Sequence, residues 1–102
     1  MSVFLYLTTT GRISGHSREI EIWFTERGGR FYLIAELRER ANWVRNIEAQ
    51  PQVRFRVGNR QFDGTARIVD DDREPELTRA VKELSHAKYG WSDGLVVEIT
   101  PA

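Results

Sequence analysis

The sequence predicts a mainly β fold of the α+β class, a small barrel of about six mostly antiparallel strands with two helices packed on it. Short segments that alternate apolar and polar residues recur along the chain, glycine-containing turns separate them, and only two stretches have helical spacing. Barrel closure is expected because it removes the exposed edges of a twisted six-stranded sheet.

The first half of the chain is expected to form three strands and a short helix. Residues 3–9 are almost continuously apolar or β-branched, which predicts a strand covered on both faces. Residues 19–25 alternate in polarity, and a glycine-containing hairpin turn at 26–29 leads to a return strand at 31–35. Residues 40–49 lose the period of two and carry one helical stripe before a proline, which predicts a helix.

The second half is expected to form a hairpin, a second helix and a last strand. The segments 53–57 and 60–69 alternate on either side of a short glycine turn. Apolar residues then recur at helical spacing from Pro75, which suits a first helical turn, to Gly90, which suits a helix end. Residues 95–100 are apolar and β-branched and predict the last strand.

Composition limits the classes of protein that the chain can belong to. The 102 residues, 40% of them hydrophobic and 29% charged, predict one domain over residues 1–102. A domain of this size buries about 65% of its unfolded surface. We therefore expect a sizeable ligand to lie in a surface groove or between two copies of the chain.

Charge and residue usage exclude further classes. The 15 basic and 15 acidic side chains cancel, which argues against a dedicated nucleic-acid binder. No segment has the roughly 18 apolar residues of a membrane span and no secretory signal is recognised, so we expect a soluble, cytoplasmic protein without a membrane span.

No metal site is expected from the ligand-forming residues. The chain has no cysteine, and its two histidines, His16 and His86, are far apart in the sequence. The acidic run of residues 70–72 precedes the second predicted helix, where carboxylates commonly cap the helix N-terminus. We interpret this run as capping rather than as a metal cluster.

The segment 8–18 is the strongest candidate for a binding site. It combines hydroxyl side chains with Gly11, Gly15, Arg12 and Arg18 in one turn between predicted strands. Glycines allow backbone N–H groups to converge, and guanidinium groups match phosphate or carboxylate, so this composition predicts an anion-binding turn. Two alternatives remain open: the turn only satisfies its own backbone, or its arginines pair with the acidic residues of the following strand.

Several segments together resemble the deazaflavin-dependent nitroreductase and quinone reductase family. The likeness covers about residues 5–69. It is carried by four segments in order: Leu7-Thr8-Thr9-Thr10-Gly11-Arg12-x-Ser14-Gly15-x-x-Arg18, the pair Ile22-Trp23-Phe24 and Tyr32-Leu33-Ile34-Ala35, the run Trp43-x-x-Asn46-Ile47-x-Ala49-x-Pro51-x-Val53, and Arg56-Val57-Gly58.

The resemblance implies a fold and an activity. Proteins of this family are similar in fold to the flavin-binding split β-barrels of the pyridoxamine-phosphate-oxidase type, which usually form homodimers with the cofactor at the subunit boundary. The implied activity is that of an oxidoreductase that binds an 8-hydroxy-5-deazaflavin coenzyme of the F420 type, or alternatively FMN. It transfers hydride to a small acceptor such as a quinone or a nitro compound.

The resemblance also implies the cofactor-binding residues, although it assigns no catalytic residue. The residues expected to hold the acidic tail of the cofactor are Thr10, Arg12, Ser14, Gly15 and Arg18. The residues expected near its ring are Ile34 and Ala35 at the end of a strand, and Trp43 and Asn46 on the first helix. For Trp43 taken without the resemblance, a role as an anchor of the core is favoured over stacking on the ring.

Three features depart from the family pattern. Ile13 stands where the family commonly has a lysine, and Glu36 opens a charged segment where the family has a small, glycine-rich loop leading to a His-Pro pair. Many members also place helices before the first strand, which form one wall of the substrate pocket. In this sequence, residues 89–91 are the candidate for that wall.

Alternative functions follow from these departures and from local composition. The chain could bind a flavin-like cofactor without turnover, or serve only as a dimeric scaffold. Single-stranded nucleic-acid binding is disfavoured because Phe55 points away from Arg54 and Arg56 by strand alternation. Trp23 is expected either at a partner interface or under the second helix, and the interface is the favoured placement.

Overall fold

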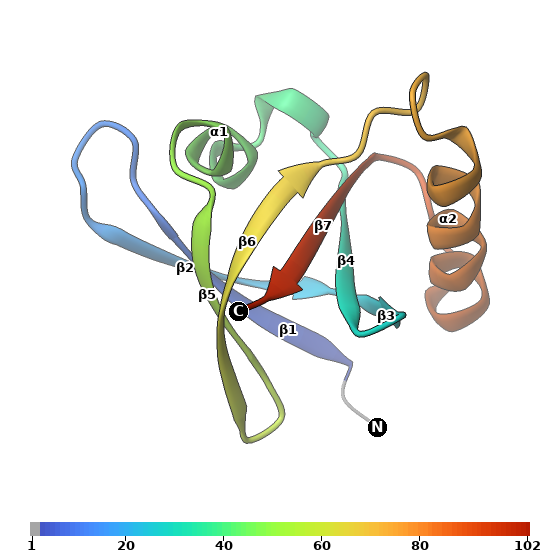
Figure 1. Ribbon diagram of the computed structural model, residues 1–102, viewed down its shortest axis with the longest axis horizontal. Helices are drawn as coiled ribbons and strands as arrows, with labels where there is room; N and C mark the ends of the chain where they lie inside the picture. Colours follow the sequence, from blue (N-terminus) through green and yellow to red (C-terminus); the bar gives the residue numbers. More distant parts are fainter. Residues whose placement is uncertain (1–2) are drawn as a thin grey trace.

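Seven strands form one antiparallel sheet that curls into a half-barrel, with two α-helices beside it (Figure 1). The computed structural model describes residues 3–102, so the first two residues of the expected domain lie outside the described part. The elements in chain order are β1 (Phe4–Thr10), β2 (Ser17–Trp23), β3 (Thr25–Arg27), β4 (Arg30–Ala35), the 3-10 turn η1 (Arg38–Arg40), α1 (Asn42–Ala49), β5 (Gln52–Val57), β6 (Arg60–Ile68), α2 (Pro75–Tyr89) and β7 (Leu95–Pro101).

The strand order β2-β1-β5-β6-β7-β4-β3 explains why the sheet curls. All six strand pairings are antiparallel. The two edge strands, β2 and β3, are consecutive in the chain and are separated only by Phe24. Because the chain leaves the partner β1 at Trp23 and joins the partner β4 at Thr25, the two edges are drawn together. A mainly β, split-barrel fold is therefore confirmed.

The break at Phe24 corrects the strand expected at residues 19–25. The segment forms two strands instead of one, which is why the sheet has seven strands and not about six. The alternation of the segment predicted an extended backbone correctly, but it carries no information about which neighbour each half pairs with. Both expected hairpins and the last strand are present in the structure.

The helices follow the expected positions with two corrections. The first α-helix starts at Asn42 rather than residue 40, because residues 38–40 form the separate turn η1. The second begins with Pro75 and ends at Gly90, whose left-handed φ of 72° suits a glycine. Its N-cap is Glu74 and not one of the aspartates. Asp70 instead accepts a hydrogen bond from the Asp72 amide and closes a turn before the helix.

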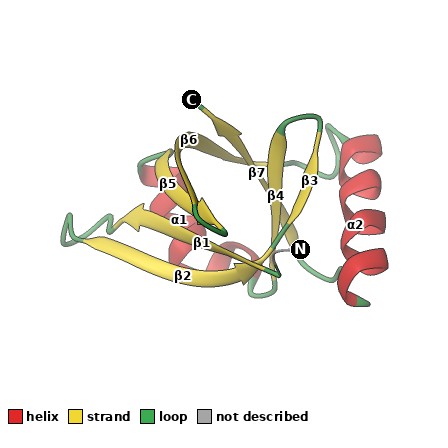
Figure 2. Cartoon of the chain, turned by 90° about the horizontal axis from the view of Figure 1, so that it is seen from below, coloured by secondary structure: helices red, strands yellow, loops and turns green. Residues whose placement is uncertain are grey.

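The core has two parts because α2 covers part of the outer face of the sheet. Inside the half-barrel, side chains of the strands pack against the buried stripe of α1. Outside, Tyr32, Ile34, Val69, Val81 and Val96 form a second cluster between the sheet and α2. The helix lies outside the sheet next to β3 and β4, as Figure 2 shows from below. Strands β4 and β7 are therefore buried on both faces.

Strand β1 is buried on one face only, which corrects the expectation of two covered faces. Leu5, Leu7 and Thr9 are fully buried, whereas the alternate residues Tyr6 and Thr8 are half-buried. The continuous apolar and β-branched run reflects strand propensity on a half-exposed face rather than a second covering layer.

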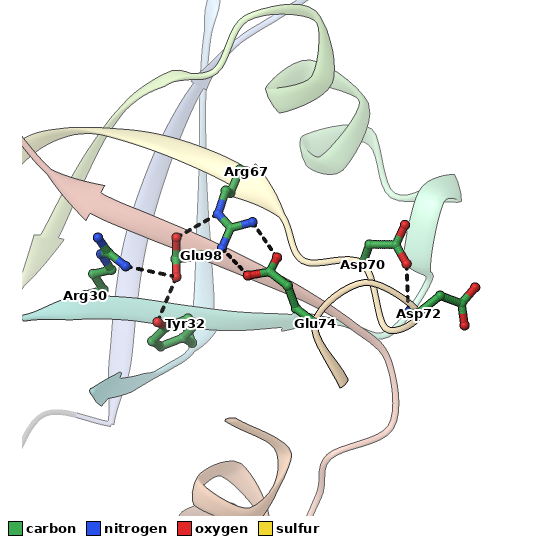
Figure 3. A network of polar contacts seen from close by, with 7 residues as sticks. All are labelled: Arg30, Tyr32, Arg67, Asp70, Asp72, Glu74 and Glu98. Carbon is green, nitrogen blue, oxygen red and sulfur yellow. Dashed lines mark hydrogen bonds and ion pairs between the residues drawn. The ribbon is translucent and has the colours of Figure 1, made fainter. Parts of the chain in front are cut away.

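A buried carboxylate connects the sheet to the start of α2 (Figure 3). Glu98 on β7 is 3% exposed, and it accepts hydrogen bonds from Arg67 Nε at 2.8 Å and the Tyr32 hydroxyl at 2.8 Å. Arg67 also donates to both carboxylate oxygens of Glu74, at 2.6 and 3.0 Å. Arg30 lies 3.8 Å from Glu98. Each buried charge is thus paired, as a folded chain requires.

The pKa values of this cluster follow from its geometry. Burial by itself raises the pKa of Glu98, but hydrogen bonds from Arg67 and Tyr32 and the two arginine charges outweigh burial and hold it below the usual 4.5. Burial and the hydrogen bond to Glu98 raise the pKa of Tyr32. The cluster therefore keeps Glu98 ionised, and we assign it a structural role.

Two findings concern the membrane span and the metal site that the sequence did not predict. Within residues 3–102, no helix is long and apolar enough to cross a membrane. Over the same range, no group of three or more His, Cys, Asp or Glu side chains is placed to hold a metal ion.

Candidate functional site

An apolar groove of about 620 Å³ opens between β2, the end of β4 and the start of α1. Its lining residues are Phe4, Ile20, Glu21, Ile22, Trp23, Ile34, Ala35, Glu36, Leu37, Ala41, Trp43 and Trp91. A mostly apolar, aromatic cavity of this size with few polar groups is typical of sites that bind cofactors or small molecules.

Strand register and the core position the walls of the groove. Ile20 and Ile22 pair with Leu7 and Leu5 on β1, so strand alternation turns them toward the inner face of the half-barrel. Trp43 on α1 packs against the inner core cluster and also lines the groove. Its two expected roles, core anchor and contact with a cofactor ring, are thus both compatible with its position.

The C-terminal end of α2 supplies an aromatic wall. The ring of Trp23 stacks on Tyr89 at 4.5 Å and 5°, and it meets Trp91 edge-on at 6.2 Å. Trp23 therefore lies against the end of α2, the second of its two expected placements, although it stays 39% exposed. Of the segment 89–91, Trp91 lines the groove, and its role as a wall of a substrate pocket stays a prediction.

A hydroxyl group holds this wall against the break between β2 and β3. The Tyr89 hydroxyl accepts a hydrogen bond from the Phe24 amide at 3.1 Å. The same oxygen lies 2.8 Å from the Phe24 carbonyl and 2.6 Å from the Val3 carbonyl, and its single proton can bond to one of them at a time. Lys88 also donates to the Phe24 carbonyl at 2.9 Å. These bonds replace strand pairing at the residue where the sheet edge turns.

The turn between β1 and β2 is closed by its own hydrogen bonds. The Gly11 amide donates to the His16 carbonyl at 2.7 Å, and the Gly15 amide to the Gly11 carbonyl at 2.8 Å. The His16 amide donates to Ser14 Oγ at 3.1 Å. A Cβ on Gly11 would lie 2.9 Å from that oxygen and 3.1 Å from the His16 carbonyl oxygen, so a larger residue there would crowd the turn. Much of the backbone is thus satisfied internally, as one alternative expected.

Asn46 fixes Arg12 to the first helix. Asn46 is 4% exposed, and its Oδ1 accepts hydrogen bonds from the Arg12 amide at 3.2 Å and from Arg12 Nη1 at 2.9 Å. Its Nδ2 donates to Thr9 Oγ1 at 3.2 Å. The asparagine was expected to contact the cofactor, whereas here its polar atoms contact this chain. Arg12 retains further N–H donors, because an arginine carries five and only one of them bonds to Asn46.

Arg18 lies at the β2 end that is next to this turn. It pairs with Thr9 of the neighbouring strand β1. On β2 it lies on the same face as Ile20, and strand geometry separates the Cα atoms of the two residues by about 7 Å. Within the described residues, neither Arg12 nor Arg18 forms an ion pair, so the alternative of pairing with Glu19 or Glu21 does not occur there. Both cations remain available to an anion.

The structure divides the expected site residues into four groups. Ile34, Ala35 and Trp43 line the groove. Arg12 contacts Asn46, which lies one helical turn after Trp43 on α1. Thr10 instead lines a separate hollow of about 220 Å³ on the outer face of the sheet. Ser14, Gly15 and Arg18 are exposed on the turn and its flanking strand.

Sequence reasoning missed most of the groove. Ile20, Ile22, Trp23 and Leu37 line it but were not expected to belong to a site. The alternation of residues 19–25 did place Ile20 and Ile22 together on one face. Only the curl of the sheet decides that this face borders a cavity.

The curled antiparallel half-barrel with an aromatic groove on its inner side defines the class of fold as a split β-barrel. Residues 1–94 match the F420H(2)-dependent quinone reductase family, and the chain belongs to this family of oxidoreductases.

Solved structures agree with the fold. An F420-H2 dependent reductase (FDR-A) matches with a TM-score of 0.68 and 24% identity, over 95% of this chain and 93% of that one. HutZ, the heme storage protein of Vibrio cholerae, matches with a TM-score of 0.80 and 19% identity, over 99% and 82%. An FAD-binding protein from Mesorhizobium loti matches with a TM-score of 0.77 and 11% identity, over 97% and 80%. At these identities the likeness shows the fold alone.

Proposed function

We propose that this chain binds the deazaflavin coenzyme F420, with FMN as the alternative, and transfers hydride to a small acceptor such as a quinone or a nitro compound. Membership of the quinone reductase family supports this proposal. The observation that carries it for this chain is the juxtaposition of an aromatic groove with a turn whose Arg12 is fixed by Asn46.

The donors of the turn fit an acidic cofactor tail. Arg12 and Arg18 have no acidic partner among the described residues, and the Ser14 hydroxyl keeps its own proton because it accepts from the His16 amide. A charge-assisted hydrogen bond of this kind contributes about 1.5–3 kcal/mol. Ile13 is 89% exposed, so the position where relatives commonly have lysine projects away from the rest of the chain. Affinity then depends on the two arginines.

The groove fits an aromatic ring. Ile34, Ala35 and Trp43 offer an apolar surface that excludes water and fixes the orientation of a flat group. The cofactor, when bound, supplies the hydride chemistry. The protein supplies position and an apolar environment, which is consistent with the mostly apolar lining of the groove.

We also propose that residues 1–102 act as one cofactor-binding domain and that the protein functions as a homodimer. The single continuous sheet supports the first point. A solved structure described as a domain-swapped dimer supports the second, and it matches with a TM-score of 0.68 and 24% identity over 95% of this chain and 79% of that one.

A fluorescence titration tests the proposal. The purified chain is titrated with F420 and, separately, with FMN, and saturable binding of one of them identifies the cofactor. Arg12→Ala is expected to weaken binding by at least about tenfold, which corresponds to about 1.4 kcal/mol. Arg45→Ala, an exposed arginine on α1, is the matched control.

Turnover is then measured by following oxidation of the reduced cofactor with a soluble quinone and a nitroaromatic compound as acceptors. Binding without turnover would support a non-catalytic cofactor-binding protein. Failure to bind either cofactor would leave the dimeric scaffold, and an Arg12→Ala variant with unchanged affinity would remove the anion-binding role of the turn.

A further inference from the structure

The charge of the groove has one sign. Its lining includes two acidic residues, Glu21 and Glu36, and none of its described lining residues is a lysine, arginine or histidine. The Glu21 carboxylate accepts a hydrogen bond from the Tyr6 hydroxyl at 2.7 Å, which holds it on the face of the sheet opposite Ile20 and Ile22. Glu36 is therefore the carboxylate that can act on a ligand in the groove.

Glu36 is the less engaged of the two carboxylates. It directly follows β4, beside the groove residues Ile34 and Ala35. Within residues 3–102 it forms no ion pair and no side-chain hydrogen bond. Arg38, a cation only two residues away, pairs instead with Asp93 at 3.5 Å. The negative charge at this end of the groove is thus not neutralised by the cation closest to it in sequence.

Aromatic rings make up much of the remaining lining. Trp23, Trp43, Trp91 and Phe4 surround the cavity, and Trp23 and Trp91 meet edge-on at 6.2 Å. The faces of indole rings carry partial negative charge and attract cations, with tryptophan the strongest of the aromatic side chains in this respect. The Glu36 carboxylate and the indole rings therefore both attract a positively charged ligand.

We propose that this groove binds flat organic cations, such as N-alkylated pyridinium or quinolinium rings, in preference to neutral or anionic rings of the same shape. All three classes gain from apolar contact and stacking. Only the cation also gains from the indole faces and Glu36, and an anionic ring is repelled by that carboxylate. The preference follows from the lining of the groove and does not require the redox activity proposed above.

The test uses the cofactor-free chain. Binding of N-methylquinolinium, quinoline and 2-naphthoate is measured by isothermal titration calorimetry and by quenching of tryptophan fluorescence, at a pH where quinoline is uncharged. The cation is expected to bind about fivefold more tightly than quinoline, and 2-naphthoate more weakly than both. Added salt is expected to reduce the preference for the cation, because Glu36 is exposed and salt screens its charge.

Variants locate the source of the preference. Glu36→Gln keeps the shape of the side chain and is expected to reduce the preference to less than about twofold. Glu39→Gln, on the exposed turn η1 and outside the groove lining, is the matched control and should keep the wild-type preference. Circular dichroism checks that both variants are folded.

Three results would overturn this inference: no binding of any of the rings, equal affinity for N-methylquinolinium and quinoline, or an unchanged preference in Glu36→Gln. The titration with F420 is a separate measurement on the same preparation. A chain that binds F420 but shows no preference for the cation refutes only the charge selectivity. A chain that prefers the cation but binds neither F420 nor FMN refutes only the proposed function.

Discussion

Replacing Asn46 with alanine should both destabilise the fold and release Arg12. The substitution removes three hydrogen bonds, two with Arg12 and one with Thr9. The Thr9 side chain is 2% exposed, so its hydroxyl would lose a partner without gaining water. An unsatisfied buried group costs about 1–3 kcal/mol, whereas exposed Arg12 recovers part of its loss by hydration. We expect the free energy of unfolding to fall by about 2–4 kcal/mol.

Urea denaturation followed by tryptophan fluorescence measures this change. Asn42→Ala, an exposed asparagine at the start of the same helix, is the matched control and should change stability by no more than about 0.5 kcal/mol. A double-mutant cycle with Arg12→Ala separates the Asn46–Arg12 contact from the contact with Thr9. We expect a coupling energy of about 1 kcal/mol between positions 12 and 46.

The same variant should bind F420 more weakly, because Arg12 would no longer be held in one position. The loss should not exceed that of Arg12→Ala, in which the charge itself is gone. A stability loss below about 1 kcal/mol, together with no coupling, would refute the reasoning that Asn46 holds the turn.

Three further substitutions test other contacts. Glu98→Gln should reduce the loss of the free energy of unfolding that acid causes. The pKa of Glu98 in the folded protein is held below 4.5, so the stabilisation by its ionised carboxylate is present above that pH and is lost as the pH falls through the folded-state pKa. Urea midpoints between neutral and acidic pH measure this, and curves parallel to wild type would contradict it. Gly94→Ala should cost about 1–3 kcal/mol, because a Cβ there meets the Ala35 backbone; unchanged thermal stability would show that the chain yields instead. Tyr89→Phe should cost about 1 kcal/mol by removing the hydroxyl contact with Phe24 while keeping the ring, and a neutral urea midpoint would argue that water replaces the hydroxyl.

The turn between β1 and β2 uses its backbone amides for its own hydrogen bonds and still exposes two arginine side chains. Its amides at Gly11, Gly15 and His16 are used internally, so the backbone contributes less to anion binding than glycine content suggests. The side chains of Arg12 and Arg18 keep their donors. The composition of the turn predicts an anionic ligand, which stays a prediction, and the groups that would hold such a ligand are mainly side chains.

The sequence by itself determined the local elements of this protein. Alternation about glycine turns predicted both hairpins, helical spacing between Pro75 and Gly90 predicted α2, and the turn after β1 was recognised from its glycines and arginines. These features depend on backbone preferences and on side-chain direction within a few residues. The spacing of residue types along the chain therefore predicts them.

Tertiary structure decided which of these elements meet. The break at Phe24 is stabilised by Tyr89, 65 residues later in the chain, and Asn46 reaches Arg12 across 34 positions. Thr10 and Arg12 are two positions apart, yet only Arg12 contacts α1, whereas Thr10 lines a hollow on the outer face of the sheet. The spacing of residue types predicts on which face of a strand or helix a side chain lies. Which residues pack against that face is decided by the curl of the sheet and by the packing of the helices on it, and a local sequence pattern carries no information about either.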